Sequence, residues 1–217
     1  MSSTAGWSRP EARSGVVWEN PARCPSARTV LTAISTTGST LDPSSTALIA
    51  PHGGSLVDLM VPDAEREAVR ASAGRRVECS HRNACDVELL VVGGFSPLLG
   101  FMHQEDYDAV VAGHRTSSGL LFGLPIVFDT DDESIAIGDR LLLTYRGQDL
   151  AVLTVESRWE PDKAKEALGC YGTTSIEHPA VRMISGERGR IYLGGSVQGL
   201  ELPQRVFPCK TPAAVRA

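Results

Sequence analysis

Histidines, cysteines and clustered acids are the side chains of this sequence that could build a catalytic or metal-binding site. The histidines are widely spaced, and no H-E-x-x-H, H-x-x-H or G-x-S-x-G pattern occurs. Neither a Gly-x-x-x-x-Gly-Lys-Ser/Thr phosphate loop nor a Gly-x-Gly-x-x-Gly dinucleotide fingerprint is present. The sequence therefore contains none of these catalytic, metal-binding or phosphate-binding motifs.

The individual candidates are explained better by local structure than by chemistry. His52 lies between Pro51 and two glycines, and we interpret it as a hydrogen-bonded turn residue rather than a ligand. His178 precedes a proline and is interpreted as the residue at which a helix starts. The acids at 105–108 and 131–133 are interpreted as solvated charge. We thus assign no catalytic, cofactor-binding or metal-binding residue.

The cysteines form no recognisable metal or disulfide framework. There are five of them, an odd number, and no C-x-x-C pair occurs. We interpret them as reduced thiols of a cytosolic protein, because disulfides are rare in that compartment. The five are Cys24, Cys79, Cys85, Cys170 and Cys209.

The composition of the 217 residues is that of an ordinary globular chain, with 42% hydrophobic and 22% charged residues. This length suits one domain, at roughly 100–200 residues per domain, with a tail. The formal net charge of −5 argues against a nucleic-acid binder, because such proteins carry a basic surface. No run of 18 apolar residues occurs, so no membrane span is predicted.

Residues 1–46 differ from the rest of the chain. Ser and Thr account for 16 of these 46 residues, and Gly and Pro for 7 more. Such a segment buries too little apolar area to offset its ordering entropy, so we predict a disordered N-terminal extension. Two functional readings stay open: an organelle transit peptide, or an over-extended gene start.

Alternating helix and strand signals follow from residue 47 onward. We predict helices over 62–73, 83–92, 104–112, 162–168 and 178–184, with Asn83 as a helix cap. For 83–92 a strand at the β-branched end is the alternative. Strands are predicted over 124–128, 140–144, 150–155, 190–193 and 196–200, the last two separated by Gly194 and Gly195. Residues 140–155 contain a hairpin signal. The sum is an α+β domain with a small, mostly antiparallel sheet or barrel and short helices.

The stretch from Gly93 to Met102 (GGFSPLLGFM) is the most specific in the sequence. Gly93 and Gly94 can adopt positive φ and permit a close backbone approach. Phe95 and Phe101 can bury large apolar areas on either side of the turn. These residues predict a rigid, packed loop.

This stretch and others in the same order resemble the N-terminal, PUA-like domain of the ATP sulfurylase (sulfate adenylyltransferase) family. The resemblance covers about 48–216. Its other pieces include the segments PHGG at 51–54, CDVEL at 85–89, YGTT at 171–174 and YLGG at 192–195.

The resemblance implies a PUA-like fold over 47–210 and a role beside a catalytic domain. That family forms adenosine 5′-phosphosulfate and pyrophosphate from sulfate and ATP bound with Mg²⁺. Its catalytic Gln-Thr-Arg-Asn-Pro loop and H-x-x-H pair do not occur here. The resemblance therefore implies an inactive chain with no cofactor of its own, and residues 211–217 would start a truncated helix leading toward the missing domain.

Partners follow from the same resemblance. We expect the catalytic domain of an ATP sulfurylase, in cis or in trans, and a homo-oligomer as a further assembly. Neither a membrane nor, given the acidic charge, a nucleic acid is expected as a partner, although a stand-alone module binding a protein or RNA is the alternative. We expect a cytoplasmic protein, or a plastid protein if 1–46 is a transit peptide. Structural or interdomain roles are predicted for Pro51, His52, Gly53, Gly54, Gly93, Gly94, Phe95, Ser96, Pro97, Gly100, Phe101, His178 and Pro179.

Overall fold

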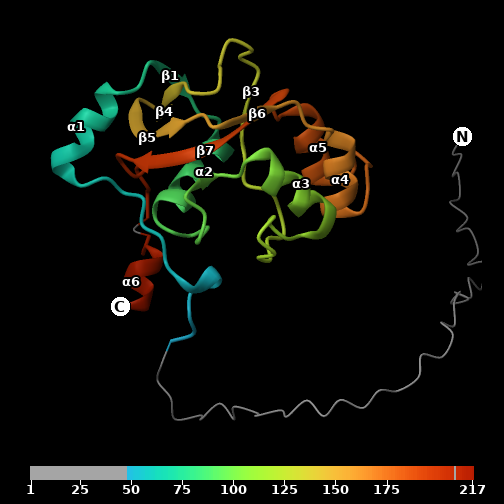
Figure 1. Cartoon of the computed structure of the whole chain (residues 1–217), viewed down its shortest axis with the longest axis horizontal. Helices are drawn as coiled ribbons and strands as arrows, with labels where there is room; N and C mark the ends of the chain where they lie inside the picture. Colours follow the sequence, from blue (N-terminus) through green and yellow to red (C-terminus); the bar gives the residue numbers. More distant parts are fainter. Residues whose placement is uncertain (1–47, 208) are drawn as a thin grey trace, which may run out of the picture. The chain divides into compact units, whose positions relative to one another are not determined.

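A computed structural model describes residues 48–207 and 209–217 (Figure 1). The predictions made for residues 1–46, including the role of Cys24, lie outside the described residues. In chain order the elements are η1 (His52–Gly54), α1 (Asp63–Ala71), β1 (Arg75–Glu78), α2 (His81–Val91), β2 (Gly100–Phe101), α3 (Gln104–Gly113), β3 (Phe128–Thr130), β4 (Arg140–Tyr145), β5 (Gln148–Thr154), β6 (Ser157–Trp159), α4 (Lys163–Tyr171), α5 (Pro179–Gly186), β7 (Ile191–Gly199) and α6 (Pro212–Arg216).

The seven described strands form one curled sheet with the order β1-β4-β5-β7-β2. Strands β3 and β6 also pair with β7, which makes β7 the central strand. All pairs are antiparallel except β1 with β4, which is parallel. The predicted α+β class with a mostly antiparallel sheet and short helices is confirmed.

The helices lie at different sides of this sheet. Helix α2 packs against β4, β5 and β7, whereas α3, α4 and α5 pack on one another near β6. Figure 1 shows α1 at the opposite end of the sheet from that three-helix group. None of the helices in the described residues is both long and apolar enough to span a bilayer.

Strand β7 runs without a break through Gly194 and Gly195, so the predicted separation into two strands is wrong. A Cβ atom on Gly195 would lie 1.9 Å from the carbonyl oxygen of Thr154, and the φ of Gly195 is 151°. The glycines therefore let neighbouring backbones approach β7 closely. They allow other backbone segments of the chain to pass close to β7, and they do not end the strand.

The hairpin prediction is confirmed, and the strand predicted before it is wrong in position. Strands β4 and β5 are joined by Arg146 and Gly147, both at positive φ, as in a type I′ turn. Of 124–128, only Phe128 belongs to a strand. Pro125 has no N–H to donate to a ladder, which accounts for the late start of β3.

The predicted helices exist, with changes at their ends. Ser80, not Asn83, caps α2: its hydroxyl accepts a 3.1 Å hydrogen bond from the Asn83 N–H. The helix therefore begins two residues earlier than predicted. Asp162 caps α4 in the same way, and this helix continues to Tyr171.

The hydrophobic core has two main clusters and a small third one. The largest lies between α2 and the sheet and contains Leu90, Phe101 and Leu153. The second lies between α3 and strands β6 and β7, and includes Val110 and Trp159. Partly buried Leu98 and Ile126 pack against both clusters. Each fully buried large side chain contributes about 1.5–3 kcal/mol.

Candidate functional site

An apolar groove of about 880 Å³ lies beside α2 in the described part of the chain. Five segments line it: the turn at 51–56, helix α2, the loop at 92–96 and the stretches 202–207 and 209–216. We call it the C-terminal groove. Its apolar and polar walls include Leu56, Cys85, Glu88, Leu89, Val92, Leu202, Phe207, Cys209, Lys210 and Val215.

The two predicted motifs at 51–54 and 93–97 meet at one end of this groove. A Cβ on Gly53 would lie 2.5 Å from Cγ of Pro97. The Ser96 hydroxyl accepts a 2.9 Å hydrogen bond from the Val57 N–H and donates a 2.7 Å bond to the Gly93 carbonyl. The turn and the loop are therefore in close contact, and the buried hydroxyl of Ser96 stabilises this contact through its two hydrogen bonds.

Gly93 is the tightest point of this contact. Its φ is +82°, and a Cβ there would lie 2.2 Å from the carbonyl oxygen of Val57. Only Gly93 of the glycine pair has a positive φ; Gly94 does not. The loop thus needs a glycine at position 93 for both conformation and space.

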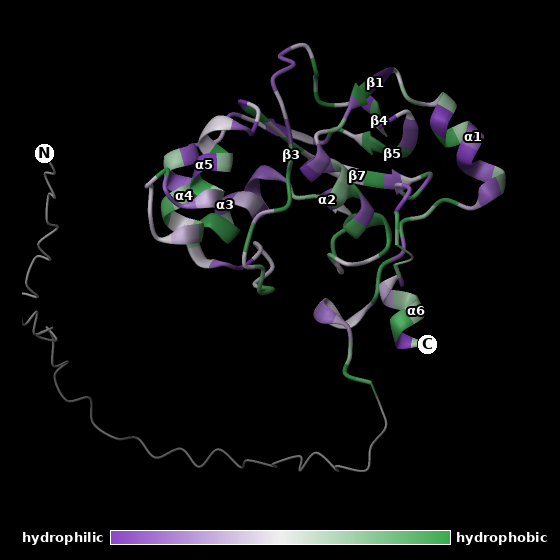
Figure 2. Cartoon of the chain, turned by 180° about the vertical axis from the view of Figure 1, so that it is seen from behind, coloured by the Kyte–Doolittle hydropathy of each residue, from purple (hydrophilic) through white to green (hydrophobic). Residues whose placement is uncertain are grey.

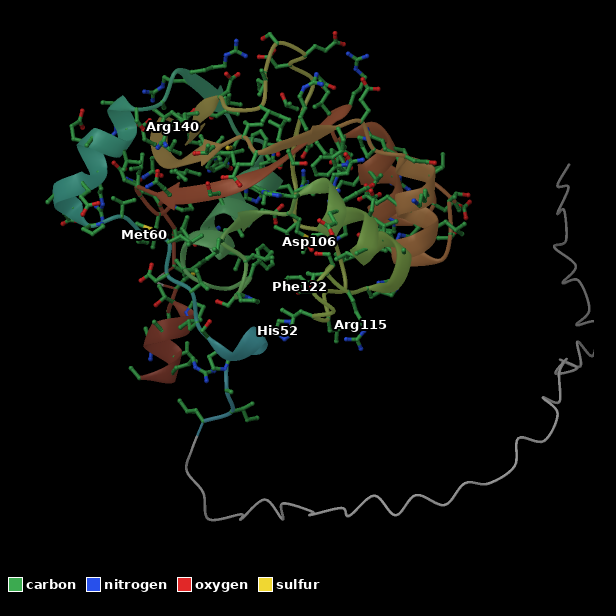
Figure 3. All side chains as sticks on the ribbon, viewed as in Figure 1. His52, Met60, Asp106, Arg115, Phe122 and Arg140 are labelled. Carbon is green, nitrogen blue, oxygen red and sulfur yellow. The ribbon has the colours of Figure 1, made fainter. Side chains whose placement is uncertain are left out.

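His52 is held in place by the loop that follows α3. Its Nε2 atom lies 2.8 Å from the Leu121 carbonyl oxygen, and its ring packs edge-on against Phe122 with centroids 5.5 Å apart. Figure 3 shows the two labelled side chains next to each other. His52 is therefore a hydrogen-bonded turn residue, in agreement with the sequence interpretation.

The other predicted residues lie elsewhere in the domain. Gly100 and Phe101 form β2, where Phe101 is buried and packs edge-on against Phe128. Phe95 is half-buried against the main core. His178 is the N-cap residue of α5 and Pro179 its first residue. The predicted set therefore divides between a groove wall, the core and a distant helix start, and its interdomain role stays a prediction.

Basic side chains predominate among the charged residues of the groove. Arg205 forms an ion pair with Glu88, with Nε 3.2 Å from Oε1. Lys210 and Arg216 also line the groove, and Arg216 donates to the carbonyl of Ile49. Three cations thus face one carboxylate in a domain whose overall charge is acidic.

The stretch that closes the groove was only partly predicted. The helix start at 211 was predicted: Thr211 accepts a 3.2 Å hydrogen bond from the Ala214 N–H and Pro212 is the first helical residue. That this helix returns to the side of α2 was not predicted. Phe207 and Val215 are 77% and 68% exposed, and no local pattern in the sequence indicates where they lie.

A separate cluster of polar side chains is buried between α3, α4 and β7. Glu166 accepts hydrogen bonds from Tyr107 and Tyr192, at 3.1 and 3.0 Å, and forms a 2.7 Å ion pair with Arg188. Burial, together with the nearby Glu166 charge, raises the pKa of Tyr107. Glu166 is 1% exposed, so this cluster is sealed from solvent and serves packing.

The described residues contain no cluster of side chains suited to bind a metal ion. No group of three His, Cys, Asp or Glu side chains within 48–207 and 209–217 could hold a metal ion. Burial raises the pKa of the Cys79 thiol to about 12 and that of Cys170 to about 11. Neither thiol is thereby activated as a nucleophile or ligand.

The curled sheet, the flanking short helices and the close-packed loop define a known class of domain. Residues 49–202 match the model of a family described as PUA-like domain. Because this match covers well over half of the chain, the chain belongs to the PUA-like domain family.

Comparison with particular proteins narrows this class. The domain is 44% identical over 177 residues to a sulfate adenylyltransferase of Symbiobacterium thermophilum, a match that covers 78% of this chain and 45% of that protein. It is 39% identical over 181 residues to the sulfate adenylyltransferase of Eremothecium gossypii, covering 78% and 36%. The chain thus spans less than half the length of these relatives, and the resemblance to their PUA-like domain is confirmed.

A solved structure shares the arrangement. It is described as a hexameric APS kinase from Thiobacillus denitrificans, and it matches with a TM-score of 0.60 and 28% sequence identity. The match covers 78% of this chain and 31% of that one. The likeness again extends over one part of a much longer polypeptide.

Proposed function

We propose that this chain supplies the PUA-like domain of a sulfate adenylyltransferase and acts as a scaffold for a separate catalytic domain. The observation that carries the proposal is the 39–44% identity, over 78% of the chain, to proteins of that name of which the match covers only 36–45%. The enzyme would convert ATP and sulfate into adenosine 5′-phosphosulfate and pyrophosphate. The catalytic domain would be joined in cis or in trans.

The chemistry supports a structural role for this part. Attack of a sulfate oxygen on the α-phosphorus needs cationic groups around the charged transition state. Two arginines with mostly covered side chains are already paired within the domain: Arg82 with Asp86 and Asp129, and Arg188 with Glu166. Because these two arginines are engaged, we propose that ATP, Mg²⁺ and sulfate bind to the partner domain.

The experiment measures pyrophosphate release from ATP and sulfate with Mg²⁺ present. The purified chain is expected to release none. A chimera, in which this chain replaces the matched segment of the Symbiobacterium thermophilum protein, is expected to form adenosine 5′-phosphosulfate. Turnover by the chain alone would overturn the scaffold role, and a folded but inactive chimera would overturn the assignment to this enzyme.

Self-association belongs to the same proposal, because the solved relative is described as hexameric. We expect the chimera to sediment as an oligomer in analytical ultracentrifugation. A strictly monomeric, active chimera would show that this domain does not need the assembly.

A further inference from the structure

We propose that the C-terminal groove is the surface on which the catalytic domain docks, with an apolar segment of that domain, flanked by acidic residues, filling it. This inference deepens the proposed function and rests on it. It names the contact surface, which the family match alone does not identify.

The apolar side chains of the groove are exposed to solvent. Leu89, Phe207 and Val215 are 41%, 77% and 68% exposed, and all three line the groove. Contiguous exposed apolar patches mark interaction surfaces on soluble proteins. Phe207 is also of a residue type enriched in protein interfaces.

Helix α6 lacks packing of its own. It has five residues, all described, and none of them is buried. A helix this short is marginal without packing. Figure 2 shows hydrophobic residues on it, and Val215 faces the groove. A surface that covers Val215 would complete the packing that α6 lacks.

The groove lies beside the last described helix of the chain. Its last lining residue is Arg216, beside Ala217. The relatives are more than twice as long as the segment they share with this chain. Within our proposal, a catalytic domain joined in cis to α6 would begin beside the groove, because α6 lines it.

The charge of the groove is mainly basic. Arg205, Lys210 and Arg216 line it together with its apolar residues, and Glu88 is the one carboxylate among the lining residues. Cations at the rim favour and orient a partner segment that carries carboxylates. The same charge could attract RNA, which the experiment below tests as a competing occupant.

Two native thiols provide a footprint of the groove. Cys85 and Cys209 line it, whereas Cys79 is buried and has a raised pKa. Maleimide labelling, read per cysteine by mass spectrometry, is compared between the full chain and the chimera. We expect the labelling rate of Cys209 to fall by about tenfold or more in the chimera.

Matched variants separate the groove from other exposed positions. Ile137 is 64% exposed and does not line the groove. An Ile137→Cys thiol is expected to label equally in the chain and the chimera. In the chimera, Phe207→Asp is expected to restore labelling of Cys209, whereas Ile137→Asp is expected to leave it protected.

The outcomes distinguish this inference from the proposed function. A chimera that forms adenosine 5′-phosphosulfate while Cys209 labels at the rate of the chain alone would overturn the groove as the docking surface and leave the function standing. Protection of Cys209 in the chain alone that grows with its concentration would assign the groove to a second copy instead. Protection by single-stranded RNA but not in the chimera would assign it to RNA.

Discussion

At the scale of single residues, Gly93 decides whether the loop at 93–97 can meet the turn at 51–54. Glycine is needed there for two separate reasons: the backbone has a positive φ, and a Cβ atom would lie only 2.2 Å from the Val57 carbonyl oxygen. Gly119 has a φ of +87° but open space around it. Substitutions at these two glycines therefore distinguish the cost of a positive φ from the cost of a steric overlap.

We expect Gly93→Ala to destabilise the domain by about 3 kcal/mol, because a left-handed backbone costs ~1–2 kcal/mol and overpacking ~1–3 kcal/mol. Gly119→Ala is the control and should cost only about 1–2 kcal/mol. Urea unfolding followed by circular dichroism measures both. Equal losses would show that the contact with Val57 relaxes freely.

Glu156 connects the end of β5 to β7 and makes stability depend on pH. The Ser196 hydroxyl donates a 2.6 Å hydrogen bond to it, and His103 Nε2 lies 3.0 Å from its other oxygen. These contacts lower the pKa of the Glu156 carboxyl. Its stabilising contribution is therefore present above the unfolded-state pKa, about 4.3, and is lost as pH falls through the folded-state pKa.

We expect Glu156→Gln to lower stability near neutral pH and to approach the wild type in acid. The effect should stay below about 1 kcal/mol, because the side chain is 40% exposed and solvent screens it. Unfolding free energies from pH 3 to 7 measure this, and Ser196→Ala should reproduce the trend. A pH-independent gap between wild type and Glu156→Gln contradicts it.

At the scale of secondary-structure elements, Glu166 joins α4 to its neighbours. Its partners are Tyr107 on α3, Tyr192 on β7 and Arg188 after α5. The side chains of Glu166 and Arg188 are 2% and 8% exposed, so the ion pair is almost inaccessible to solvent. Removing one member would leave a buried charge without compensation.

We expect Glu166→Ala to cost about 3–5 kcal/mol because Arg188 stays buried without its partner. The matched control is Glu133→Ala, which breaks a pair with Arg190 whose side chains are 69% and 66% exposed. That control should cost less than about 1 kcal/mol. Thermal and urea unfolding compare the two, and similar costs would argue against a stabilising role for the buried pair.

At the scale of the whole described domain, the two main core clusters are physically connected. Leu98 and Ile126 pack against both, and β7 contributes residues to both. Clusters that share packing residues and a central strand are expected to unfold together, as single domains of this size usually do. The sheet and the three-helix group should therefore form one cooperative unit.

We expect Leu153→Ala in the first cluster and Val110→Ala in the second to shift one common transition. Leu153→Ala should cost about 2–5 kcal/mol. Fluorescence of Trp159 reports on the second cluster once Trp7 and Trp18 are replaced by Phe, and far-ultraviolet circular dichroism reports on all elements. Two separate midpoints in either variant would contradict cooperative unfolding.

Local signals in the sequence were sufficient for several elements. The pair Arg146-Gly147 between apolar runs predicts the β4–β5 hairpin, and proline at the first helical position predicts α5 and α6. These signals work because turn and cap preferences depend on a few neighbouring residues. The short strands β1, β2 and β6 were not predicted, because a few residues carry too little periodicity.

The sequence by itself determined the α+β class, the hairpin, the starts of α5 and α6 and the family resemblance carried by the GGFSPLLGFM stretch, since each depends on residue types at short spacing. Only the tertiary structure decided that β7 continues through Gly195, that β1 pairs in parallel with β4, and that residues after 202 return to α2 to build a groove. These features depend on which segments, far apart in the sequence, pack against each other, and on which side chains remain exposed when they do. Neither is encoded in a local pattern.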